Sequence, residues 1–163
     1  MPETDMVVRD LKLNVDGVFD FKELYNLIKD WYSLHKYDFY EKNYKEVLKE
    51  EAKDIKIEFT GDRVIDYYIK YIIDITIRLN NHKIVKGPNN KNLVQGNLSI
   101  SFQSKLQTDF EASWEGKPLL KFTRGLYDKF VRSDKLDVYK KELKEQSYEI
   151  FNEIKAYLNL HKF

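Results

Sequence analysis

The stretch that decides the fold is residues 65–79, which read IDYYIKYIIDITIRL. The odd positions are all apolar or aromatic: Ile65, Tyr67, Ile69, Tyr71, Ile73, Ile75, Ile77 and Leu79. Most even positions carry polar side chains, among them Asp66, Lys70 and Asp74. An alternation with a period of two residues predicts a β-strand that buries one face. At about 3.3 Å per residue such a strand would span roughly 50 Å, so we also expect a bulge or a break within it.

A second alternating run follows at residues 98–110. Its apolar positions are Leu98, Ile100, Phe102, Leu106 and Phe110, whereas the opposite face is wholly polar. One dry face and one wet face are typical of an antiparallel sheet that helices cover on one side only.

Shorter runs predict the other strands. Residues 7–15 alternate, with Val7, Leu11, Leu13 and Val15 on the apolar side and Val8 among the polar residues. Residues 37–48 are less regular, but their aromatic residues indicate a further strand.

The flanks of the central stretch predict turns. Residues 55–60 alternate and lead into Gly61-Asp62, a pair typical of a hairpin turn. Residues 82–86 extend the central strand or pair with it, and residues 87–90, Gly-Pro-Asn-Asn, predict a turn.

Capping signals locate two of the predicted helices. Asp20 followed by Glu23 is a helix-start pattern, and apolar residues then recur at three- and four-residue steps, so we expect a helix over residues 20–35. Pro118 suits the first turn of a second helix, over residues 119–131.

A long last helix should begin at Ser133 or Asp134. Along it, apolar residues recur every seven positions: Leu136, Leu143, Ile150 and Tyr157. One face of this helix therefore packs along its whole length, and we expect it to lie across the sheet.

Together these elements predict one α+β domain over residues 1–163. It consists of a curved antiparallel β-sheet covered on one face by helices, with a long C-terminal helix. With 42% hydrophobic and 15% aromatic residues, the chain is too apolar to be disordered, and it is long enough to bury a two-layer core. It contains no cysteine, which excludes disulfides, thiolate metal sites and cysteine nucleophiles.

The order of elements resembles the helix-grip fold of the START and Bet v 1 (SRPBCC) superfamily over nearly the whole chain, without a diagnostic motif. Members typically hold an apolar ligand between a curved sheet and the last helix. The resemblance therefore implies a cavity between the strands at 65–79 and 98–110 and residues 136–157. The family usually has two short helices after its first strand, where one longer helix is predicted here, and the helix at 119–131 is an addition.

A second resemblance concerns residues 114–128, WEGKPLLKFTRGLYD. This segment is similar to conserved archaeal proteins of unknown function, which imply no activity for the chain.

No motif predicts catalysis, a cofactor or a metal site. The three histidines, His35, His82 and His161, are too far apart for a local metal motif. His35 falls on the apolar stripe of the first helix, where a lone histidine is more often structural than a ligand. Gly-rich phosphate loops and nucleophile elbows are absent from the sequence. We therefore predict no catalytic residues, no cofactor and no bound metal.

The N-terminal residues are acidic, and no apolar segment follows them, so a secretion signal is not predicted. Residues 67–79 are interrupted by charges and too short to cross a bilayer as a helix. The expected location is the cytoplasm.

Aromatic side chains suggest where a small ligand would lie. Tyr67, Tyr71 and Phe102 would line a cavity from the strands, because tyrosine offers apolar area together with a hydroxyl group that orients a ligand. By the helix-grip resemblance, Ile150 and Ile154 would complete the cavity from the last helix. The other interpretation, that these residues belong to a solid core, ranks first, because aromatic residues in a strand usually pack in the core.

Basic residues suggest a second site. Residues 117–163 hold 11 Lys/Arg against 7 Asp/Glu, and Lys121, Arg124 and Lys129 accompany aromatic residues on the helix at 119–131. Such a helix can contact a membrane surface or nucleic acid, or it can simply pack through an amphipathic face. The packing alternative ranks first, so neither nucleic acid nor a membrane is the predicted partner.

Three functional hypotheses follow. The first is a non-enzymatic module that binds a small apolar ligand or lipid between sheet and helix. The second is a protein-interaction or scaffold domain with a solid core, which uses the polar sheet face or the basic C-terminal region. An enzyme with a dispersed polar site ranks third. A cavity on the order of 300 Å³ or more would favour the first hypothesis, and a solid interior the second.

Overall fold

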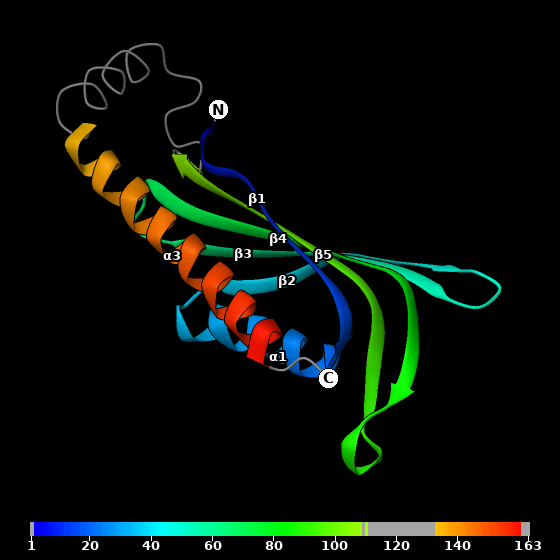
Figure 1. Cartoon of the computed structure of the whole chain (residues 1–163). Helices are drawn as coiled ribbons and strands as arrows, with labels where there is room; N and C mark the ends of the chain where they lie inside the picture. Colours follow the sequence, from blue (N-terminus) through cyan, green and yellow to red (C-terminus); the bar gives the residue numbers. More distant parts are fainter. Residues whose placement is uncertain (1, 109, 111–132, 161–163) are drawn as a thin grey trace.

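One antiparallel sheet and two long helices make up the part of the chain that the computed structural model describes, residues 2–108, 110 and 133–160. In chain order, the elements are β1 (Glu3–Phe19), α1 (Phe21–Leu34), β2 (Asp38–Leu48), β3 (Lys53–Val64), β4 (Ile69–Lys86), the 3-10 turn η1 (Pro88–Asn90), β5 (Asn92–Thr108) and α3 (Ser133–Leu160). The strand order is β1-β5-β4-β3-β2, and all neighbours are antiparallel. Both helices lie on one face of the sheet (Figure 1), which confirms the predicted α+β class.

β4 lies at the centre of the sheet and has the predicted alternation. Its odd residues from Ile69 to Leu79 are at most 1% exposed. Ile75 lies opposite Phe59 of β3 and Phe102 of β5, so three strands supply one apolar layer. The other face of the sheet is polar and carries the ion pair between Lys105 Nζ and Asp74 Oδ2 at 2.7 Å.

The bulge or break expected within residues 65–79 is displaced, because the irregularity of β4 lies just beyond them. The register between β4 and β5 shifts between Asn80 and Lys83, and Asn81 adopts a left-handed backbone with φ of 52°. Beyond this point the β4–β5 hairpin bends away from the β2–β3 hairpin, which projects in another direction (Figure 1). Residues 82–86 extend β4, and η1 forms the expected turn.

The hairpin turn predicted at Gly61-Asp62 is wrong, because β3 continues through both residues to Val64. Gly61 is buried against the ring of Tyr32, where an added Cβ would lie 2.1 Å from Cε1. The glycine therefore permits a close approach of α1 to the sheet instead of forming a turn.

The true turn lies at residues 65–68. There, Asp66 Oδ1 accepts hydrogen bonds from the backbone N–H groups of Tyr68 at 2.7 Å and Ile69 at 2.8 Å. An aspartate that bonds its own following backbone stabilises a turn. The central strand consequently begins at Ile69, and the prediction that it includes Tyr67 is wrong.

β1 is longer than the predicted strand at 7–15, and its N-terminal half is irregular. Register shifts occur between Met6 and Val8 and between Val8 and Leu11. They turn Val8 toward the helices, where it is 7% exposed. The expectation that Val8 lies on the polar face is therefore wrong, since a bulge reverses the side on which later residues lie.

α1 begins as predicted. Asp20 caps the helix, because its Oδ1 accepts a hydrogen bond from the backbone N–H of Glu23 at 3.1 Å. Tyr32 anchors the other end to the sheet through a hydrogen bond from its hydroxyl to the carbonyl oxygen of Ile73 at 2.9 Å.

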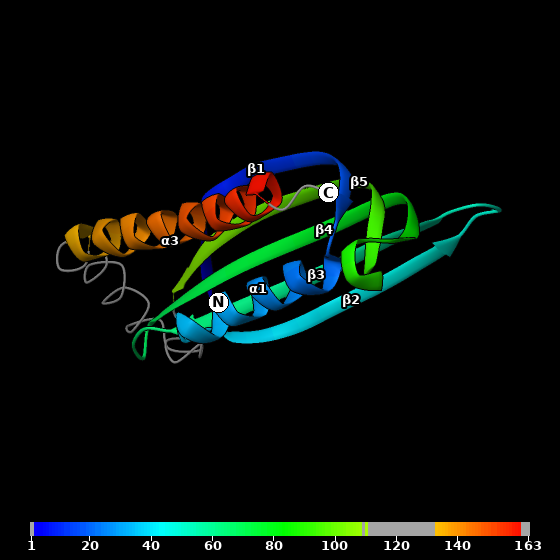
Figure 2. The same ribbon diagram turned by 60° about the horizontal axis from the view of Figure 1, so that its bottom comes forward.

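α3 covers the sheet along β5 and β1 (Figure 2). Leu143, Ile150, Ile154 and Leu158 are at most 1% exposed, which confirms that this helix packs on the sheet through one face. Phe151 meets Phe102 edge to face, with ring centroids 5.4 Å apart. The helix predicted at 119–131 lies outside the described residues.

Candidate functional site

The five predicted cavity residues do not share one environment. Tyr71, Phe102, Ile150 and Ile154 lie between the sheet and α3, each at most 1% exposed and all within one packed hydrophobic core. Tyr67 lies in the turn before β4 and is 63% exposed, so the structure does not bring it to the other four. The predicted surface residues Lys121, Arg124 and Lys129 lie outside the described residues.

Polar contacts hold Tyr71 in this core. Its hydroxyl donates to Glu142 Oε2 of α3 at 2.9 Å. Burial, followed by this hydrogen bond to a carboxylate, raises the pKa of Tyr71 far above its usual value. The Tyr71 hydroxyl, which was expected to orient a ligand, therefore donates its hydrogen bond to α3 instead.

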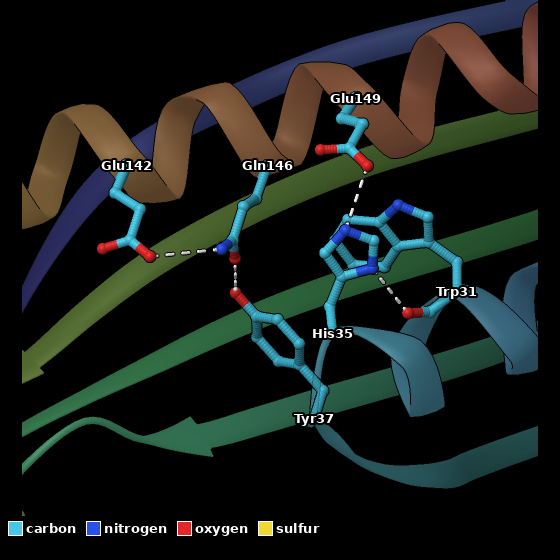
Figure 3. A network of polar contacts seen from close by, with 6 residues as sticks. All are labelled: Trp31, His35, Tyr37, Glu142, Gln146 and Glu149. Atoms are coloured by element: carbon cyan, nitrogen blue, oxygen red, sulfur yellow. Dashed lines mark hydrogen bonds and ion pairs between the residues drawn. The ribbon is translucent and has the colours of Figure 1, made fainter.

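A polar network joins the C-terminal end of α1 to α3 (Figure 3). The hydroxyl of Tyr37 donates to Gln146 Oε1, and Gln146 Nε2 in turn donates to Glu142 Oε1 at 3.4 Å. Burial raises the pKa of Tyr37 well above its usual value. The phenol therefore stays protonated and keeps donating even at alkaline pH.

His35 forms the second half of this network. Its ring stacks on Trp31, with centroids 4.0 Å apart. Nδ1 lies 2.9 Å from the carbonyl oxygen of Trp31, and Nε2 lies 3.0 Å from Glu149 Oε1. Both neighbours are hydrogen-bond acceptors, so each contact forms when the ring nitrogen that faces it carries a proton. As the sequence suggested, His35 has a structural setting. Its contact with Glu149, which we call the clasp, links α1 to α3.

Next to this clasp, a groove of about 750 Å³ runs between the two helices. We call it the α1–α3 groove and define it by its lining residues: Glu23, Asn26, Leu27, Asp30, Trp31, Ser33, Leu34, Glu153 and Tyr157. α1 supplies most of the wall, and α3 closes it with Glu153 and Tyr157.

The α1–α3 groove combines an apolar surface with an acidic rim. Leu27, Trp31 and Leu34 supply the apolar part, and Leu34 is 79% exposed. Glu23, Asp30 and Glu153 are its charged residues, and among the described residues no lysine or arginine lines it. The groove therefore offers apolar contact together with negative charge.

Trp31 contributes an unmet hydrogen-bond donor. The side chain lines the α1–α3 groove, yet the residue is only 2% exposed. Its Nε1 is buried and has no hydrogen-bond partner among the described residues. In Figure 3 this nitrogen is on the side of the indole that faces α3. A buried unpaired donor costs free energy, so an acceptor supplied from the groove would stabilise it.

At the N-terminal end of α1, Lys91 of the β4–β5 connection contacts two acidic residues. Lys91 Nζ lies 2.6 Å from Asp20 Oδ2 and 3.6 Å from Glu23 Oε1. Burial alone would raise the pKa of Asp20, but the hydrogen bonds from Lys91 and from the backbone of Glu23 outweigh burial and hold the pKa below its usual value. Tyr157 also reaches this end, donating to Glu23 Oε2 at 2.9 Å.

Leu27 and Leu34 were missed as functional candidates from the sequence, although a signal was present. They lie seven residues apart on α1, beside the buried stripe that includes Leu24 and Ile28. Leu27 is partly buried against the core, but Leu34 is left exposed beside this stripe, and such a residue indicates a second contact surface on the same helix.

A second hollow, of about 760 Å³, lies between the β2–β3 turn at residues 49–52, the bend of the β4–β5 hairpin and β1. Acidic and basic residues both line it, including Asp16, Glu51, Lys49 and Lys83. Lys49 is paired internally with Asp54 at 2.9 Å. This hollow offers neither a charge of one sign nor an apolar floor.

No model of a known protein family matches this sequence, and no curated protein matches it. Within residues 2–108, 110 and 133–160, no three His, Asp or Glu side chains are grouped so that they could hold a metal ion. In the same part of the chain, neither helix has the length and apolar character needed to cross a membrane.

Proposed function

We propose that this chain is a protein-interaction domain that binds a segment of a partner protein in the α1–α3 groove. The observation that carries the proposal is the groove itself, which has a volume of about 750 Å³. It combines an apolar surface that includes the exposed Leu34 with a rim of acidic residues. Exposed apolar surface framed by polar residues is characteristic of interaction sites.

The rigidity of the two walls supports this proposal. The clasp between His35 and Glu149 and the contact from Tyr37 to Gln146 fix α1 against α3. A groove that exists before binding lowers the ordering cost of association.

A small apolar ligand between the sheet and α3 has weaker support. Tyr71, Phe102, Ile150 and Ile154 already belong to one packed core. A ligand there would have to separate α3 from the sheet.

The proposal can be tested by selecting peptides from a random display library on the wild-type chain. Affinities of the enriched peptides are then measured for wild type, for Leu34→Ser and for Val138→Ser. Val138 is a matched control, because it is also an exposed apolar residue, at 65%, but lies on α3 outside the groove. We expect Leu34→Ser to weaken binding at least about tenfold, which corresponds to roughly 1.4 kcal/mol, and Val138→Ser to leave it unchanged.

Circular dichroism must show that both variants remain folded. Peptides that bind Leu34→Ser as tightly as wild type, or a selection that enriches none, would contradict the proposed function.

A further inference from the structure

We infer that the segment bound in the α1–α3 groove is a cationic amphipathic helix, an inference that rests on the proposed function. Four features of the groove lead to this partner: two acids without ion pairs, an ammonium site formed by the chain itself, the spacing of groups on α1, and the unmet donor of Trp31.

Asp30 of α1 and Glu153 of α3 both line the groove. Among the described residues, neither carboxylate forms an ion pair with a lysine, arginine or histidine. The neighbouring Glu149, in contrast, is paired with His35. Lysine or arginine side chains of a partner would complement the two remaining acids, and an acidic partner would be repelled.

Lys91 shows how the same acidic surface takes an ammonium group. It lies between Asp20 and Glu23, at 2.6 and 3.6 Å. The hydrogen bond to Asp20 raises the pKa of Lys91 above its usual value. One ammonium group thus lies against two carboxylates at this end, which leaves a net negative charge there, whereas among the described residues no ion pair involves Asp30 or Glu153.

The spacing along α1 favours a helical occupant. Glu23 and Asp30 are seven residues apart, two turns or about 10.5 Å along a helix. A partner helix lying along α1 has the same rise, so basic residues at positions i and i+7 would meet these two acids. Apolar residues at i+3 and i+4 would then lie over Leu27, between the two acids, as in helix-in-groove recognition.

The indole of Trp31 supplies an observation independent of charge. Its Nε1 is buried without a partner beside the groove. An oxygen acceptor carried by the bound helix, from an Asn, Gln or Ser side chain, would satisfy this donor.

Two synthetic peptides of identical composition test the inference. One has Lys at i and i+7 with Leu at i+3 and i+4, and the other has the same residues permuted so that no helical face combines them. Fluorescence anisotropy at low salt should give at least about tenfold tighter binding of the first peptide. Its affinity should fall as salt is raised, because salt screens exposed charges.

Charge-reversal variants locate the contact. Asp30→Lys and Glu153→Lys should each weaken binding of the patterned peptide about tenfold, which corresponds to roughly 1.4 kcal/mol. Glu145→Lys is the matched control, with the same charge change at an exposed position of α3 outside the groove, and should change binding less than about twofold. A peptide with Glu in place of both Lys should bind the double variant Asp30→Lys/Glu153→Lys better than it binds wild type.

Glu153→Lys and Glu145→Lys with equal effects would overturn the inference, and so would equal binding of the patterned and permuted peptides. If library-selected peptides depend on Leu34 but are neutral or acidic, the proposed function stands and the cationic partner is excluded. If the affinity of no peptide depends on Leu34, the proposed function and the cationic partner are both excluded.

Discussion

Asp20 connects three parts of the molecule through one residue. Its side chain caps α1 and pairs with Lys91, and its carbonyl oxygen accepts a hydrogen bond from the hydroxyl of Tyr157 at 3.3 Å. Because the residue is only 3% exposed, its contacts are partly shielded from water and from screening by salt. It therefore fixes the N-terminal end of the groove.

Replacing Asp20 separates its two side-chain roles. Asp20→Ala removes both cap and ion pair and should lower the free energy of unfolding by about 1–2 kcal/mol at neutral pH. Asp20→Asn keeps an oxygen that can cap the helix and should cost less. Denaturant unfolding of both variants checks the order, and equal losses for the two would contradict the role of the cap.

The same residue predicts a pH dependence. The pKa of Asp20 in the folded chain lies below its ordinary value of 3.8, so the ionised carboxylate stabilises the fold above that value. This stabilisation is lost as the pH falls through the lowered pKa. The difference in melting temperature between wild type and Asp20→Asn should therefore be present at neutral pH and shrink in acid. A difference that grows as the pH falls below 3.8 would contradict the assignment.

At the scale of elements, α3 is the cover of the sheet. Ile154 is fully buried, whereas its neighbour Lys155 is exposed. Ile154→Ala should lower the free energy of unfolding by about 2–5 kcal/mol, since it leaves a cavity in the core, and Lys155→Ala should be close to neutral. Urea unfolding at several protein concentrations measures both. A loss below about 1 kcal/mol, or a midpoint that moves with dilution, would indicate that α3 packs elsewhere.

β2 offers another exposed surface, but its features oppose docking. Tyr40, Tyr44 and Leu48 are 47%, 51% and 72% exposed along this edge strand. A register shift between Glu41 and Asn43 interrupts its pairing edge, and Lys42 lies within the shift. Bulges and charges are devices that keep an edge strand from pairing with another chain.

The elements could be predicted from the sequence wherever burial imposes a period. The odd residues of β4 and the seven-residue repeat of α3 each face the core, so the spacing of their apolar residues is visible in the sequence. Gly61 was misread because a glycine in a turn and a glycine beneath an aromatic ring look alike in a sequence. Only the contact with Tyr32 distinguishes them.

The candidate site was less predictable for a similar reason. Whether Leu34 is buried or exposed depends on where α3 crosses α1, which is decided by contacts more than a hundred residues apart, such as the one between His35 and Glu149. The apolar cavity residues were predicted as a group, and four of the five do meet in the core. Tyr67 lies outside the core because the chain turns at residues 65–68 and β4 begins only at Ile69.

At the scale of the whole molecule, the two faces offer a partner different chemistry. The helical layer carries the α1–α3 groove, with its apolar floor and its acids. The open sheet face is polar and carries ion pairs within the sheet, such as the one between Lys70 and Asp62 at 2.9 Å. Binding on the helical side would leave the sheet face unchanged.

The most direct measurement of this account is a map of amide chemical shifts in ¹⁵N-labelled protein titrated with the patterned cationic peptide. We expect the largest changes at Asn26, Asp30 and Leu34 of α1 and at Glu153 of α3, because these residues line the groove. Amides of the open sheet face, such as Ser99 and Ser101 of β5, should not move. Shifts concentrated on the sheet face, with those four residues unmoved, would contradict the assignment of the α1–α3 groove as the binding site.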